Sequence, residues 1–124
     1  MSKIITILGS TGSIGKQTLK ILDKKKKFFN IFILSANKNY IEIIKQIKKY
    51  KPKYFIISDF NVYKRIKNEY KTKKIKILNN IDEVKVNKKI DITVSAIPGI
   101  AGLKPTLFSI RFCKKILIAN KESI

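Results

Sequence analysis

Three glycines follow the first apolar run of the chain, and their spacing could serve to hold a phosphate group. Residues 9–15 read Gly-Ser-Thr-Gly-Ser-Ile-Gly, between an apolar run at 4–8 and an amphipathic stretch at 14–22. A glycine turn that leads from a strand into a helix exposes backbone N–H groups, and the helix N-terminus adds partial positive charge. The glycine spacing is a variant of the dinucleotide-binding pattern Gly-x-Gly-x-x-Gly. The segment therefore predicts a phosphate site, with an ordinary strand-to-helix turn as the alternative.

A second polar segment bears on which nucleotide such a site would accept. Asn37, Lys38 and Asn39 follow the apolar run at 31–35, and the first acid after them is Glu42. Sites for NAD usually carry an acid at this point, which binds the ribose 2′-hydroxyl. An acid would repel a 2′-phosphate, whereas a lysine and two amides would attract one, so the segment favours NADPH. The same three residues are also good turn formers, which is the alternative.

The end of the chain carries a third polar segment. Asn120, Lys121 and Glu122 follow an apolar run at 116–119. Polar groups of different charge after a strand could contact a cofactor and a substrate together. A loop with a weak surface ion pair between Lys121 and Glu122 is the alternative.

The sequence lacks the residues that several kinds of chemistry usually require. The sequence contains no histidine, and Cys113 is its only cysteine, which excludes an internal disulfide and a Cys-x-x-Cys site. Cys113 is predicted to be a small core residue. No group of acids lies close enough in sequence to suggest a hard-cation site. We therefore assign no catalytic or metal-ligating residue within these 124 residues.

The formal net charge of +20 comes almost entirely from dispersed lysines. Together with frequent isoleucine and asparagine, this composition is typical of an AT-rich genome, and we interpret the charge as a solvated surface whose self-repulsion makes stability sensitive to salt. A basic nucleic-acid-binding module is the alternative. The apolar run at 4–8 is too short for a signal peptide or a membrane span, so we expect the cytoplasm and no membrane partner.

Apolar runs alternate with helical patterns along the chain, which predicts an α/β fold with a doubly wound, mostly parallel, Rossmann-like sheet. The length allows one domain. The predicted strands are 4–8, 31–35, 54–57, 75–78, 92–95 and 116–119. The helices are expected around Ile14, Thr18, Ile21 and Leu22 on one face, around Ile43, Ile44 and Ile47, around Val62 and Ile66, and over 102–112. Ligands bind at the carboxyl ends of parallel strands, so segments 9–14, 36–39, 96–99 and 120–123 should crowd one edge.

Three motifs together resemble the 1-deoxy-D-xylulose 5-phosphate reductoisomerase family. They are Ile-Leu-Gly-Ser-Thr-Gly-Ser-Ile-Gly at 7–15, Asn-Lys-Asn at 37–39 and Ala-Asn-Lys-Glu-Ser at 119–123. The run Gly-Ile-Ala-Gly-Leu-Lys-Pro-Thr-Leu at 99–107 is also similar to that family. That family converts 1-deoxy-D-xylulose 5-phosphate to 2-C-methyl-D-erythritol 4-phosphate in isoprenoid precursor synthesis, using NADPH and Mg²⁺ or Mn²⁺. An NADP-dependent dehydrogenase of another family with the same fold is the alternative.

The resemblance also implies roles for individual residues. The pyrophosphate would be held by Thr11, Gly12, Ser13 and Ile14, the 2′-phosphate by Asn37, Lys38 and Asn39, the nicotinamide half by Asn120 and Glu122, and the sugar phosphate substrate by Lys121. The family usually has glycine where this chain has Asn37. Its members are far longer, so residues 1–124 would form an incomplete enzyme, the N-terminal NADPH-binding domain. The metal-binding and C-terminal domains would lie beyond it, and the full-length protein would be a homodimer.

Overall fold

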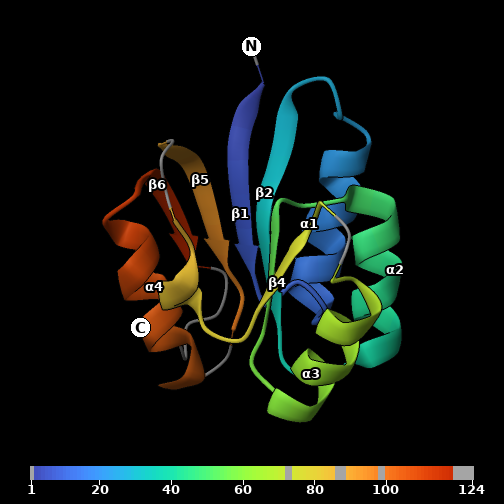
Figure 1. Ribbon diagram of the computed structural model, residues 1–124. Coiled ribbons are helices and arrows are strands. Elements are labelled where there is room, and N and C mark those ends of the chain that lie inside the picture. The colour runs from blue at the N-terminus through green and yellow to red at the C-terminus, as the bar shows by residue number, and fades with distance from the viewer. Residues whose placement is uncertain (1, 72–73, 86–88, 98–99, 119–124) are drawn as a thin grey trace.

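The computed structural model describes residues 2–71, 74–85, 89–97 and 100–118 (Figure 1). The elements in chain order are β1 (Lys3–Leu8), α1 (Ser13–Asp23), β2 (Phe29–Ala36), α2 (Tyr40–Tyr50), β3 (Tyr54–Ile57), α3 (Phe60–Glu69), β4 (Lys76–Leu78), the short 3₁₀ helix η1 (Ile81–Glu83), β5 (Ile90–Ser95), a second 3₁₀ helix η2 (Ile100–Gly102), α4 (Leu103–Ile110) and β6 (Cys113–Ile118). No helix among these residues is long and apolar enough to cross a membrane.

The strands form one six-stranded sheet in the order β4-β3-β2-β1-β5-β6, and every neighbouring pair is parallel. Helices α1, α2 and α3 lie on one face of the sheet, and α4 with η1 lies on the other (Figure 1). This arrangement confirms the predicted doubly wound α/β fold. Because the strands are parallel, their carboxyl ends share one edge, the lower edge in Figure 1.

Two apolar layers hold the helices on the sheet. On one face Leu34 and Phe55 pack with Ile43 and Ile47 of α2 and with Ile66 of α3, all fully buried. Burying side chains of this size stabilises the fold by about 2 kcal/mol each. On the other face Phe108 of α4 and Ile81 of η1 pack against strand residues that include Leu8, Phe32 and Ile56. A buried hydroxyl contact of 2.8 Å between Ser95 and Thr106 also links β5 to α4.

The buried face of α1 differs from the prediction. Leu22 is buried as expected, but Ile14 is 38% exposed and Ile21 is 60% exposed, and the residues that face the sheet are Gly15, Leu19 and Leu22. The physical reason is the close approach of Gly15 to the preceding loop, where a Cβ would lie 2.2 Å from the carbonyl oxygen of Gly9. Only a glycine permits that contact, so it determines which stripe of the helix faces inward.

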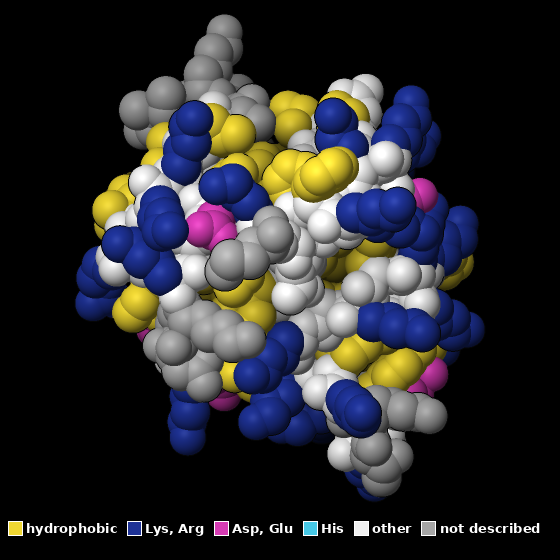
Figure 2. Space-filling model, turned by 90° about the horizontal axis from the view of Figure 1, so that it is seen from above, with side chains coloured by type: hydrophobic (Ala, Val, Ile, Leu, Met, Phe, Trp, Pro, Cys, Tyr) yellow, Lys and Arg dark blue, Asp and Glu magenta, His cyan; other side chains and the backbone are white. Residues whose placement is uncertain are grey.

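The lysines do not form a continuous basic surface on the face shown in Figure 2. Viewed from above the orientation of Figure 1, Lys and Arg side chains are spread around the face and separated by apolar and uncharged side chains. Acidic side chains are few on this face. On this face the distribution is that of a solvated lysine surface rather than a single stripe that would track a nucleic-acid backbone.

Asp91, at the start of β5, is tied to both neighbouring strands. One carboxylate oxygen accepts a hydrogen bond of 2.7 Å from the amide of Ile4, and the other lies 3.3 Å from Nζ of Lys114. The hydrogen bond from Ile4, followed by the contact with Lys114, lowers the pKa of Asp91 below its ordinary value of 3.8. Because the folded-state pKa is lowered, ionised Asp91 stabilises the fold above this ordinary value, and that contribution is lost as the pH falls through the folded-state pKa.

We expect Asp91→Asn to lower the melting temperature at neutral pH and to flatten the decline of melting temperature between about pH 5 and pH 2. The asparagine cannot offer Ile4 and Lys114 a charge that titrates in this range. Thermal unfolding followed by circular dichroism at several pH values measures both effects. The exposed carboxylate of Asp82 serves as the control, since Asp82→Asn should change the neutral-pH stability less. Parallel pH profiles for wild type and Asp91→Asn would contradict this assignment.

Candidate functional site at the carboxyl edge of the sheet

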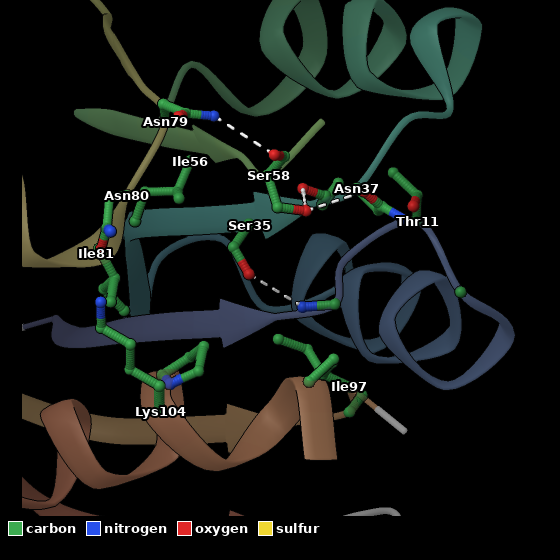
Figure 3. Close-up of a pocket in the computed structure, with 16 residues that line it drawn as sticks. Thr11, Ser35, Asn37, Ile56, Ser58, Asn79, Asn80, Ile81, Ile97 and Lys104 are labelled. Carbon is green, nitrogen blue, oxygen red and sulfur yellow. Dashed lines mark hydrogen bonds between the residues drawn. The ribbon is translucent and has the colours of Figure 1, made fainter. Parts of the chain in front are cut away.

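A cavity of about 610 Å³ lies along the carboxyl edge of the sheet (Figure 3). Its walls come from the glycine loop after β1, from the ends of β2, β3, β4 and β5, and from the first turn of α4. Gly9, Gly12, Ala36, Asn37 and Ala96 all line it, so three of the four segments predicted to meet at this edge do meet there. The fourth, 120–123, lies outside the described residues.

The first part of the glycine loop is fixed by internal hydrogen bonds. Gly9 has a φ of +81°, which favours glycine, and its amide donates to the carbonyl oxygen of Ser35 at 3.0 Å and to Oγ of the same residue at 3.1 Å. The amide of Ser10 donates to the same carbonyl at 2.8 Å. The Ser10 carbonyl accepts a 2.9 Å hydrogen bond from Nε2 of Gln46, a buried side chain of α2. These contacts give the loop one defined conformation.

The second part of the loop, residues 11–14, offers backbone amides as hydrogen-bond donors. The amides of Thr11, Gly12, Ser13 and Ile14 have no acceptor within the described part of the chain, and no side chain caps the start of α1. A Cβ on Gly12 would have one atom outside its immediate neighbours within 4 Å, the Gly9 carbonyl oxygen at 3.8 Å. Thr11 and Gly12 line the cavity. The open backbone and the helix N-terminus together form a site suited to an anion such as a pyrophosphate.

The three residues after β2 have different surroundings. Asn37 lines the cavity, and its Oδ1 accepts a hydrogen bond of 2.9 Å from the Ser58 hydroxyl (Figure 3). Lys38 is exposed and forms no ion pair with any described residue. Asn39 caps α2, since its Oδ1 accepts from the amide of Glu42 at 3.2 Å. The segment therefore combines a helix cap with two side chains available to a ligand.

The electrostatics of the cavity suit an anion. None of the described residues that line it is acidic, and its one charged lining residue is Lys104. Lys104 lies 2.9 Å from a carboxylate oxygen of Asp82, an exposed pair that joins α4 to η1. The described residues contain no group of three or more His, Cys, Asp or Glu that could hold a metal ion.

Several residues of the site were not predicted from the sequence. Ser58 and Asn79 lie at the ends of β3 and β4, and Asn79 Nδ2 donates to the carbonyl of Ser58 at 3.3 Å (Figure 3). It also donates to the carbonyl of Ile57 at 2.8 Å. The carboxyl ends of the predicted strands 54–57 and 75–78 are the signal that could have identified both. Gln46 carries a different signal, because it is a polar residue within the apolar stripe of α2.

Other predicted residues do not enter the cavity or are not described. Asn120, Lys121 and Glu122 lie outside the described residues, as does Gly99. Cys113 is half-buried at the start of β6 and packs on the apolar layer that contains Phe108, in agreement with its predicted role as a core residue.

Comparison with known proteins identifies the relatives of this chain. The family model for 1-deoxy-D-xylulose 5-phosphate reductoisomerase matches residues 5–124. The enzyme of that name from Pelagibacter ubique is 47% identical over 98% of this chain, and the one from Vesicomyosocius okutanii is 39% identical over the same share. The chain spans 32% of the length of each.

Solved structures give the same result. The reductoisomerase from Zymomonas mobilis in complex with NADPH superimposes with a TM-score of 0.87 at 32% identity, covering 99% of this chain and 33% of that one. A second reductoisomerase, solved with NADPH, fosmidomycin and magnesium, gives a TM-score of 0.86 at 29% identity, covering 98% of this chain and 31% of its own. Neither alternative, a nucleic-acid-binding module or a dehydrogenase of another family, finds support. The chain belongs to the 1-deoxy-D-xylulose 5-phosphate reductoisomerase family.

Proposed function

We propose that residues 1–124 form an NADPH-binding domain and that the cavity at the carboxyl edge is its cofactor site. The observation that carries the proposal is the set of four amides at Thr11–Ile14. They have no acceptor among the described residues, and they lie beside a cavity to which those residues contribute no acid. NADPH carries a pyrophosphate and a 2′-phosphate, so it needs two anion-binding regions. The amides would hold the first, and Asn37 and Lys38 after β2 would hold the second.

In the whole enzyme, this domain would serve the conversion of 1-deoxy-D-xylulose 5-phosphate to 2-C-methyl-D-erythritol 4-phosphate. NADPH, when bound, supplies hydride to the sugar phosphate. The part of this chain is to bind and orient the cofactor over the carboxyl edge. By resemblance, Asn39 would assist at the 2′-phosphate, Asn120 and Glu122 would contact the nicotinamide half, and Lys121 the substrate.

The divalent metal would be bound elsewhere in the whole enzyme. The described residues offer no cluster of ligands for it. We infer that Mg²⁺ or Mn²⁺ and the catalytic acids are held by the part of the family sequence that this chain does not span. This chain would then bind the cofactor without catalysing the reaction by itself. The homodimer and the cytoplasmic location expected for the full-length protein stay predictions.

Calorimetric or fluorescence titration with NADPH and NADH tests the cofactor assignment. NADPH should bind about tenfold more tightly or better, since a hydrogen bond to a charged group contributes about 1.5–3 kcal/mol. Lys38→Glu should remove that preference, because the new carboxylate repels the 2′-phosphate. Lys48→Glu makes the same charge change in the last turn of α2, away from this cavity, and should keep the preference. Equal affinity for both nucleotides in wild type, unchanged in Lys38→Glu, would refute the assignment.

A further inference from the structure

A chain of hydrogen bonds connects the ends of β2, β3 and β4 through Asn37, Ser58 and Asn79 (Figure 3). Ser58 follows β3, and its amide donates to the carbonyl of Ala36 at 3.0 Å. The next amide, of Asp59, donates to the carbonyl of Asn37 at 3.2 Å. On the other side Asn79 Nδ2 donates to the carbonyls of Ile57 at 2.8 Å and Ser58 at 3.3 Å. The backbones of Asn37 and Ser58 are therefore held in one relative position.

The side chains of these two residues complete the network. The Ser58 hydroxyl lies 2.9 Å from Oδ1 of Asn37 and 3.4 Å from the Ala36 carbonyl. A hydroxyl carries a single proton, so the shorter contact, to Asn37, is the one that it makes best. A carboxamide has its oxygen on one side and its NH₂ group on the other. Anchoring the oxygen on Ser58 therefore directs the NH₂ group away from Ser58.

The freed NH₂ group of Asn37 is a donor next to a cation. It has no acceptor within the described residues, and the neighbouring Lys38 side chain is exposed. An NH₂ group donates and cannot accept, so it suits a phosphate oxygen better than a neutral hydroxyl. If Ser58 did not hold the oxygen, the amide could turn and present that oxygen to the anion instead.

We propose that Ser58 is a positioning residue, which fixes the Asn37 amide as a donor toward the 2′-phosphate and so contributes to the selection of NADPH over NADH. This inference rests on the proposed function. It adds to the cofactor site a side chain from the end of β3, which acts through Asn37 and not by direct contact with the nucleotide.

Titrations of the 124-residue chain with NADPH and NADH test this role. Ser58→Ala should raise the dissociation constant for NADPH about threefold to tenfold, and that for NADH less than about twofold. Ser58→Thr retains a hydroxyl and should restore NADPH affinity to within about twofold of wild type. In an Asn37→Ala background, Ser58→Ala should have no further effect, because the amide that it positions is gone.

Asn37→Asp provides an independent test with almost no change of shape. The aspartate still accepts from Ser58 but presents a negative oxygen where the NH₂ group was, so NADPH should bind about tenfold more weakly or worse while NADH is retained. If the Ser58→Ala variant kept the same preference for NADPH as wild type, the positioning role would be overturned and the cofactor assignment would stand. Equal weakening of both nucleotides, or a further loss in the Asn37→Ala background, would also overturn it. A wild-type chain without preference would overturn both.

Discussion

Gly15→Ala is expected to reduce the free energy of unfolding by about 3 kcal/mol or more, because it overpacks a closed contact. The new methyl group would lie 2.2 Å from the carbonyl oxygen of Gly9 and 2.7 Å from Cα of Ser10. Both are backbone atoms, and hydrogen bonds to Ser35 and from Gln46 fix their positions. The loop cannot move aside cheaply, so α1 must shift from the sheet. Urea unfolding followed by circular dichroism measures the loss.

The neighbouring glycine of the same motif provides the matched control. At Gly12 the nearest atom to an added Cβ is the Gly9 carbonyl oxygen at 3.8 Å, and φ is −76°, which any residue adopts. Gly12→Ala should therefore cost no more than about 1 kcal/mol, the effect of a poorer N-cap residue. If the two alanine variants unfolded at the same urea concentration, the packing of α1 on the loop would not be as described.

Gly12→Ala is expected to weaken NADPH binding about tenfold or more, although it leaves the fold intact. Gly12 lines the cavity between the amides of Thr11 and Ser13, and among the described residues outside its immediate neighbours only the Gly9 carbonyl oxygen, at 3.8 Å, lies near its Cβ position. An added methyl group would occupy the space in which a pyrophosphate must approach these amides. Titration with NADPH, beside an unfolding curve of the same variant, measures binding and stability separately.

Gly12→Ala and Gly15→Ala thus separate two roles of glycine within the loop motif at 9–15. Gly15 serves the packing of the helix, and Gly12 serves the approach of the ligand. A Gly12→Ala variant that binds NADPH as tightly as wild type would show that the phosphate does not lie over this turn.

The alternation of strands and helices could be predicted from the sequence, because buried parallel strands are apolar at consecutive positions and helices are not. Residues 54–57 were predicted as a strand with the bounds that β3 has. The inward face of α1 could not be predicted by periodicity. Ile14 and Ile21 satisfy the helical pattern, but the contact between Gly15 and the loop at Gly9 decides the orientation, and that contact depends on tertiary structure.

The site, too, could be predicted only in part, because some of its contacts depend on tertiary structure. A parallel sheet brings strand ends to one edge, so the glycine loop, Asn37 and Ala96 were expected to meet, and they do. The position of Ser58 after the predicted strand 54–57 could have placed it at this edge, but its role depends on its hydrogen bond with Asn37 across two strands, which the sequence does not show. The sequence also could not show that Ser35 occupies the amides of Gly9 and Ser10, which leaves the later amides of the loop for a ligand.

A crystal structure of this chain with NADPH tests the central claim most directly. We predict that the pyrophosphate oxygens lie within hydrogen-bonding distance of the amides of Thr11, Gly12, Ser13 and Ile14, with the 2′-phosphate beside Asn37 and Lys38. NADPH bound elsewhere, for example in the cavity at the opposite edge between Ile31, Lys51 and Tyr70, with those four amides making no contact to it, would contradict the account.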